Sequence, residues 1–209
     1  MSELHIKSTT RNLILASSSP RRSKLLDQAG LVYKIDPSSA DEQLPNGLSP
    51  WKSAEVIAGR KATEVAERHP ESLVLAADTI VVLDQNILGK PNNHSEAAGM
   101  LRSLSGRSHE VCTGVAMFWT DDLYRVTKKI LFHERTKVTF ASLSDEEIWH
   151  YIETGSPMDK AGSYGIQEDY GSLFVRRIEG DYFNVVGLPL NKLYQMIKST
   201  DPHLLLRQV

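Results

Sequence analysis

Residues 73–83 form an apolar run that only Asp78 and Thr79 interrupt. Continuous runs rich in Val, Ile and Leu are typical of a strand covered on both faces. An ionised carboxylate inside such a strand costs several kcal/mol unless it is paired, hydrogen-bonded or bound to a metal. Asp78 is therefore expected either where the strand reaches a cleft, or beside a cation. A turn in which the carboxylate binds backbone amides is the structural alternative.

The rest of the pattern alternates strands and helices in the N-terminal half and has successive strands in the middle. Strands are predicted at 13–16, 32–35, 73–83, 109–119, 124–141 and 173–178, and helices at 20–30, 50–69, 95–104, 145–155 and 189–197. Ser144 and Glu147 form a capping box, and Trp149 is assigned to the core side of that helix. Residues 180–187 are expected to be a loop. The pattern predicts an α/β fold with a mixed sheet.

The first helix begins in an unusual way. Its strand is followed by the serine-rich turn Ser17–Ser18–Ser19, then Pro20 at the first helical position, then Arg21 and Arg22. The helix dipole disfavours cations at this end, so two arginines lose stability there unless an anion binds among them. Free backbone N–H groups and two guanidinium groups together would bind phosphate. Two solvated arginines are the alternative.

Two further cations and one acid are candidates for the same site. Lys61 lies four residues from both Ile57 and Val65, so it points along the buried stripe of its helix. It either extends to the edge of that stripe or reaches a polar cleft. Glu42 lies in an acidic loop, where most acids are only solvated. Lys90 follows Gly89, which lets the backbone approach a ligand, and precedes a proline.

Residues 157–167 combine two glycines, mixed charges, one aromatic residue and one amide without amphipathic period. A segment of this length without periodicity is typical of a binding loop on a rigid scaffold. Gln167, at its end, offers both a hydrogen-bond donor and an acceptor, as recognition of a base edge requires.

Composition excludes several classes of protein. The chain has 209 residues, 41% of them hydrophobic and 24% charged, and a net charge of −2 that gives no general attraction for nucleic acid. The single cysteine, Cys112, excludes an intramolecular disulfide and lies in an apolar stretch expected in the core. No apolar run spans a membrane and residues 1–11 lack a signal sequence. We therefore expect a cytoplasmic protein with no nucleic-acid or membrane partner.

Several motifs, in this order along the chain, resemble the Maf family of nucleoside triphosphate pyrophosphatases. They are LASSSPRR (15–22), ADTIV (77–81), LGKP (88–91), SGR (105–107), DKAGSYGIQ (159–167) and VGLP (186–189). The ending at Gln167 is similar to the branch that hydrolyses dTTP and UTP. The resemblance implies one Maf-like domain over 12–199, with a flexible N-terminus (1–11) and a C-terminal tail (200–209).

The resemblance also implies a fold, a reaction and roles for residues. The expected fold is an elongated α/β structure with two lobes around a deep cleft, similar to Maf and ITPase proteins, and commonly a homodimer. The expected reaction cleaves a nucleoside triphosphate between the α and β phosphates with a divalent metal. Asp78 corresponds to the proton acceptor, Glu42 to a second acid, Arg21, Lys61 and Lys90 to phosphate-binding cations, and Arg21, Thr79 and Gln167 to specificity positions.

From these roles, Glu42 and Asp78 are predicted to hold Mg²⁺ or Mn²⁺, since hard cations prefer oxygen ligands. Ser17 and Arg22 are predicted to contact the substrate as part of the phosphate-binding turn. The alternative function is a nucleotide-sensing regulator of cell division that acts through a protein partner.

Overall fold

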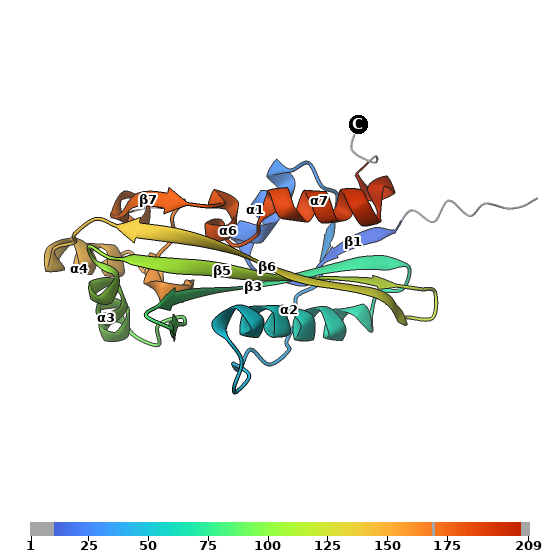
Figure 1. Cartoon of the computed structure of the whole chain (residues 1–209), viewed down its shortest axis with the longest axis horizontal. Coiled ribbons are helices and arrows are strands. Elements are labelled where there is room, and N and C mark those ends of the chain that lie inside the picture. Colours follow the sequence, from blue (N-terminus) through green and yellow to red (C-terminus); the bar gives the residue numbers. More distant parts are fainter. Residues whose placement is uncertain (1–10, 169, 206–209) are drawn as a thin grey trace, which may run out of the picture.

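The computed structural model describes residues 11–168 and 170–205, which form a seven-stranded mixed sheet flanked by helices. The strand order is β2-β1-β3-β5-β6-β7, and β4 pairs with β3. Figure 1 shows an elongated molecule in which β3, β5 and β6 run along the long axis. Helix α2 covers one face of this sheet, and α1, α6 and α7 lie on the other. The predicted elongated mixed α/β fold is confirmed.

The strands are β1 (Asn12–Leu15), β2 (Lys34–Ile35), β3 (Ser72–Leu83), β4 (Asn86–Leu88), β5 (Ser108–Thr120), β6 (Val126–Phe140) and β7 (Val175–Glu179). The helices are α1 (Pro20–Gln28), α2 (Pro50–Ala66), α3 (His94–Leu104), α4 (Asp145–Glu153), α5 (Gly171–Phe174), α6 (Tyr182–Val186) and α7 (Leu190–Thr200). Short 3₁₀ turns are η1 (Ser156–Asp159), η2 (Ala161–Ser163) and η3 (Pro202–Leu204). In this part of the chain, no helix has the length and apolar character that crossing a membrane requires.

Strand β3 is the centre of the sheet, and its burial follows its sequence. Every residue of β3 is buried except Asp78 and Thr79, which are partly exposed. On one edge, β3 pairs with β5 from Leu73 to Val82. On the other edge, β1 pairs with residues 72–75 and β4 with residues 81–83. Within the described residues, 76–80 therefore have no strand neighbour on that edge, and this gap contains Asp78.

Side-chain alternation along β3 sends Asp78 and Thr79 to opposite faces of the sheet. Asp78 shares its face with Ala76 and Ile80, which pack toward α2. Thr79 shares its face with Ala77 and Val81, which belong to the larger core. That core is built with α1, α3, α4 and α7. Cys112 is a free, buried residue of β5, as predicted, and burial raises the pKa of its thiol to about 12.

Some predictions made from the sequence were wrong. Trp149 is not in the core: it is 39% exposed and lies near Arg102. Ile148, Tyr151 and Ile152 form the buried side of α4, so the apolar stripe is one position away from the tryptophan.

Two segments in the C-terminal third also differ from the prediction: one contains an additional helix, and the other is a strand that begins later. The segment 180–187 contains helix α6, which the Asp181 side chain caps by accepting from the N–H groups of Phe183 and Asn184. The last strand begins at Val175, because Leu173 lies in the short helix α5 and is exposed.

The predicted ends of the domain are only partly within the described residues. Residues 1–10 and 206–209 lie outside them, so the flexible N-terminus and the tail stay predictions. Helix α7 runs to Thr200, and Leu204 beyond it is buried against the larger core.

A glycine in the sheet allows helix α2 to pack tightly against β5. Gly114 of β5 lies directly under α2, and a Cβ at that position would overlap the carbonyl group of Ala54. We expect Gly114→Ala to lower the free energy of unfolding by about 1–3 kcal/mol, the usual cost of overpacking. Gly99→Ala in α3, where a Cβ meets nothing, is the control and is expected to be neutral or stabilising. Equal urea midpoints for both variants would contradict this packing.

A buried histidine predicts how stability depends on pH. His109 is 3% exposed, contacts the Tyr164 hydroxyl at 2.7 Å, and burial lowers its pKa to about 4. Below the unfolded pKa of about 6.5, the unfolded chain binds a proton that the native protein does not. Stability should therefore fall by about 2 kcal/mol from neutral pH to about pH 5 through this residue.

The measurement is urea unfolding at the two pH values. His109→Gln, which cannot titrate, should remove this part of the pH dependence, whereas His150→Gln on the surface of α4 should retain it. A parental pH dependence in His109→Gln would show that this histidine titrates normally.

Candidate functional site

A cleft of about 540 Å³ opens at the gap in the edge of β3. It is lined by residues from both faces of the sheet, from the turn before α1, from the loop before α2 and from the segment 159–167. Every residue that the sequence predicts for the site lines this one cleft: Ser17, Arg21, Arg22, Glu42, Lys61, Asp78, Thr79, Lys90 and Gln167.

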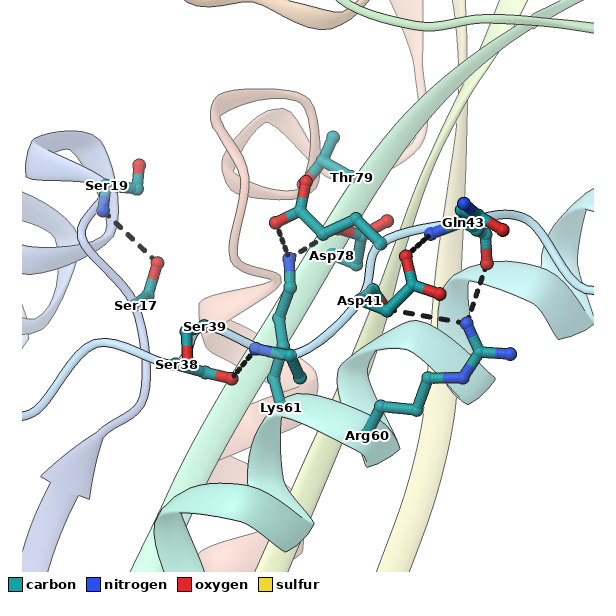
Figure 2. A network of polar contacts seen from close by, with 12 residues as sticks. Ser17, Ser19, Ser38, Ser39, Asp41, Gln43, Arg60, Lys61, Asp78 and Thr79 are labelled. Carbon is teal, nitrogen blue, oxygen red and sulfur yellow. Dashed lines mark hydrogen bonds and ion pairs between the residues drawn. The ribbon is translucent and has the colours of Figure 1, made fainter.

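Lys61 joins the two predicted acids. Its ammonium group lies 2.8 Å from Oδ1 of Asp78 and 2.7 Å from Oε1 of Glu42. The side chains of Lys61 and Asp78 are 9% and 14% exposed, whereas that of Glu42 is 54% exposed. Figure 2 shows Lys61 extending from α2 toward Asp78 on β3. Lys61 thus reaches a polar cleft, and Asp78 lies at an opening beside a cation.

The loop that carries Glu42 is fixed on both sides of this residue. Glu64 accepts hydrogen bonds from Ser38 and Ser39, and Arg60 donates to the carbonyl oxygen of Gln43. Burial acts to raise the pKa of Glu42, but the hydrogen bond and charge of Lys61, with the charges of Lys90 and Arg22, hold it below its ordinary value. Glu42 is therefore ionised at neutral pH.

Arg22 is a half-buried cation whose hydrogen bonds go to neutral groups. It donates to the carbonyl oxygen of Gly187 at 2.9 Å, to the Ser17 hydroxyl at 3.0 Å and to the Thr79 hydroxyl at 3.2 Å. No carboxylate among the described residues pairs with it within 4 Å. Burial lowers its pKa, but a guanidinium stays charged in proteins. A guanidinium whose hydrogen bonds all go to neutral groups can still pair directly with an anionic ligand.

Arg21, unlike Arg22, pairs with a carboxylate. Its guanidinium pairs with Asp159 at 2.9 Å, across the cleft in the binding loop. Burial acts to raise the pKa of Asp159, but hydrogen bonds from Lys160 and Arg21 lower it below its usual value. The sequence analysis did not identify Asp159 as a partner of Arg21. Nothing in the pattern could pair residues 138 positions apart.

The start of α1 has donors that face the cleft. The Ser19 side chain makes no capping hydrogen bond to the helix. Ser17 accepts from the N–H of Ser19 and from Arg22, so both lone pairs of its hydroxyl oxygen are used. Its hydroxyl hydrogen is left as a donor. Together with Arg22 and the N–H groups of the first turn, it forms the cluster of donors for which the sequence predicts phosphate binding.

Lys90 and Gln167 complete the lining from other segments. Lys90 is exposed, and the carbonyl oxygen of Gly89 before it accepts from Gly162 of the binding loop at 3.0 Å. Gln167 is partly buried, and its side-chain nitrogen Nε2 is buried without a hydrogen-bond partner among the described residues. A buried amide donor without a partner is costly, which favours a ligand that accepts from it.

Two carboxylates are available for a metal ion. Within residues 11–168 and 170–205, no group of three or more His, Cys, Asp and Glu side chains gathers in a way that could hold one. Glu42 and Asp78 alone would supply two ligands. This fits Mg²⁺, which usually combines one or two carboxylates with water and substrate phosphates.

The comparisons with known proteins agree with the motifs. Curated relatives named dTTP/UTP pyrophosphatase include those of Geobacillus sp. (strain WCH70), 53% identical over 90% of this chain and 97% of its own, and Symbiobacterium thermophilum, 50% identical over 90% and 93%. A solved nucleoside-triphosphatase, dITP/XTP pyrophosphatase from Mycobacterium abscessus, aligns over 91% of this chain and 98% of its own with 14% identity and a TM-score of 0.46.

The family model described as "Maf-like protein" matches residues 12–200, which is nearly all of the part that forms the sheet, the helices and the cleft. Together with the relatives at about half identity, this match shows that the chain belongs to the Maf-like protein family.

Proposed function

We propose that this protein hydrolyses dTTP and UTP to the nucleoside monophosphate and pyrophosphate. The observation that carries the proposal is the cleft in which Lys61 binds Asp78 and Glu42 while Arg22 lies nearby without a carboxylate partner. A triphosphate carries about four negative charges, and the cleft has an excess of basic over acidic side chains: Arg21, Arg22, Lys61, Lys90 and Lys160 against Glu42, Asp78 and Asp159. The names of the relatives support the choice of dTTP and UTP.

The phosphates would bind where donors and cations converge. Arg22, the Ser17 hydroxyl and the first N–H groups of α1 would bind phosphate oxygens from one side, and Lys61 and Lys90 from the other. Hydrogen bonds hold Arg22, Ser17 and Lys61 in place before the substrate arrives, so they would stabilise the charge that develops on the leaving pyrophosphate with little reorganisation.

Asp78 would be the proton acceptor. Lys61 binds its Oδ1, which orients the carboxylate, and Oδ2 can accept the proton of a water molecule. The water oxygen forms a bond to the α-phosphorus as the bond to the bridging oxygen breaks, and that electron pair leaves with pyrophosphate. The water's proton goes to Asp78.

The proposed reaction also includes a divalent metal ion, which the carboxylates of the cleft could bind. Glu42 and Asp78 would hold it together with phosphate oxygens, and it would supply Lewis-acid stabilisation of the charge on the phosphates. The Lys61 ammonium has three N–H donors, so the one that binds neither Asp78 nor Glu42 would be left for a phosphate oxygen. The cytoplasmic location and the homodimer stay predictions from the sequence.

A nucleotide panel tests the proposed reaction. We expect pyrophosphate and monophosphate from dTTP and UTP in the presence of Mg²⁺, with kcat/KM values well above those for CTP and GTP. Pyrophosphate release is measured with an enzyme-coupled assay, with and without a chelator that removes Mg²⁺. Equal kcat/KM values for all four nucleotides, or release of inorganic phosphate alone, would contradict the proposal.

Asp78→Asn tests the proton acceptor. The substitution keeps the shape of the side chain but removes the carboxylate, so kcat/KM for dTTP should fall by at least about 10²-fold, the lower end of general-base contributions. Circular dichroism and the thermal midpoint should show that the protein still folds.

The matched control is Asp84→Asn in the turn between β3 and β4. Asp84 is an exposed partner of Arg107 with a left-handed backbone conformation that asparagine adopts readily. This variant should keep parental activity. Near-parental hydrolysis by Asp78→Asn would show that another group accepts the proton.

A further inference from the structure

Behind the cleft lies a buried polar network that the sequence analysis did not identify. Thr113 of β5 and Asn184 of α6 are both fully buried. The Thr113 hydroxyl lies 2.9 Å from the carbonyl oxygen of Asn184 and 2.9 Å from the Thr79 hydroxyl. Thr79 in turn lies 3.2 Å from Arg22. The network thus connects a helix on one face of the sheet to a residue that lines the cleft.

The orientation of the Asn184 amide is fixed by its partners. Its Oδ1 accepts from the backbone N–H of Thr113 at 3.1 Å. Its Nδ2 donates to the carbonyl oxygen of Val111 and to the Thr136 hydroxyl, both at 3.0 Å. A carbonyl oxygen can only accept and a backbone N–H can only donate, so the opposite orientation is excluded. Asn184 is therefore a rigid anchor for β5 at Thr113.

The direction of each hydroxyl hydrogen in the network follows from the same rule. The carbonyl oxygen of Asn184 only accepts, so Thr113 gives its single hydroxyl hydrogen to it. In the contact between the two threonines, Thr79 must then be the donor. Arg22 has no acceptor atom, so Thr79 also accepts from Arg22. The order is Arg22 to Thr79, Thr79 to Thr113, and Thr113 to Asn184.

This order limits what Thr79 can do toward the cleft. Its hydrogen is used by Thr113 and one of its lone pairs by Arg22, which leaves one lone pair and no donor. Ser17 is the opposite case, because both of its lone pairs are used and its hydrogen is free. Phosphate oxygens only accept hydrogen bonds, so they fit Ser17 and not Thr79. The ligand group at Thr79 must donate.

The position of Thr79 in the cleft favours a contact between its hydroxyl and the base of the nucleotide. Thr79 shares its face of β3 with Val81, and Gly162 of the binding loop packs closely on Val81. The same loop ends at Gln167, whose buried Nε2 is an unpartnered donor. One acceptor, at Thr79, and one donor, at Gln167, therefore line the same cleft. Uracil and thymine present a donor at N3 beside carbonyl acceptors, whereas N3 of cytosine is an acceptor.

We propose that Thr113 and Asn184 are specificity-determining positioning residues. They hold the Thr79 hydroxyl as a hydrogen-bond acceptor toward the cleft, so the site favours a base with a donor at N3 and disfavours cytosine. This inference rests on the proposed function and explains one part of its substrate choice. Neither residue touches the base.

Thr113→Val is the test, because valine keeps the shape of threonine but cannot accept from Thr79. The Thr79 hydrogen becomes free to rotate and can donate to N3 of cytosine. We expect the ratio of kcat/KM for UTP to that for CTP to fall by about tenfold, equivalent to one hydrogen bond. Thr113→Ser keeps the hydroxyl and should restore the parental ratio.

Thr120→Val is the matched control. Thr120 is another fully buried threonine of β5, far from the cleft, whose hydroxyl bonds His69 and Ser72. It should lose stability in the same way without a change in the UTP to CTP ratio. The thermal midpoints of all variants are measured alongside the kinetics.

The outcomes separate the two proposals. An unchanged ratio of kcat/KM for UTP to that for CTP in Thr113→Val, including a case in which both values fall by the same factor, would overturn the inference. The same change of this ratio in Thr120→Val would also overturn it. A parent protein that hydrolyses no nucleoside triphosphate would instead overturn the proposed function.

Discussion

The site depends on the charge of one buried lysine. An ammonium group with as little solvent contact as that of Lys61 costs several kcal/mol unless it is paired. Asp78 and Glu42 provide the pairing, and in return Lys61 reduces the repulsion between the two carboxylates. The three residues come from α2, β3 and the loop between β2 and α2. The ion pairs therefore hold the loop to the sheet and bring the acids to one place, where removal of any one would leave the others poorly compensated.

The second constraint is the interrupted edge of β3. If one strand paired along this whole edge, residues 76–80 would have a strand neighbour and the cleft could not open at this point. Instead β1 ends its pairing at Leu75 and β4 begins at Val81. Side-chain alternation then gives the cleft two chemically different walls: Asp78 and Lys61 toward α2, and the Thr79 hydroxyl, beside Arg22, toward α1 and α6. The proposed proton acceptor and the proposed base contact thus lie on different faces of one strand.

Much of this could be predicted from the sequence where a local pattern carries the information. The apolar run around Asp78, the Pro20 helix start and the placement of Lys61 on a buried stripe each depend on neighbouring residues. The strand 109–119 and the capping box at Ser144 were found in the same way. Trp149 was misplaced because nine residues of helix define a stripe too loosely to exclude an adjacent position.

The remaining features depend on tertiary contacts that no local pattern contains. The pairing of Arg21 with Asp159 joins α1 to a loop far along the chain. The helix α6 was missed because an asparagine among aromatic and β-branched residues lacks a helical period. Asn184 is buried there only because Thr113, Val111 and Thr136 supply partners from two strands. Such residues become recognisable once the sheet is known.

The most direct test of the central claim is a crystal structure with α,β-imido-UTP, a substrate analogue that cannot be cleaved at the α–β bond, and Mg²⁺. We predict that the triphosphate contacts Arg22 and Lys61 and that the base lies between Thr79 and Gln167. One water molecule should lie between the Asp78 carboxylate and the α-phosphorus. A triphosphate that contacts neither Lys61 nor Arg22 would contradict the account.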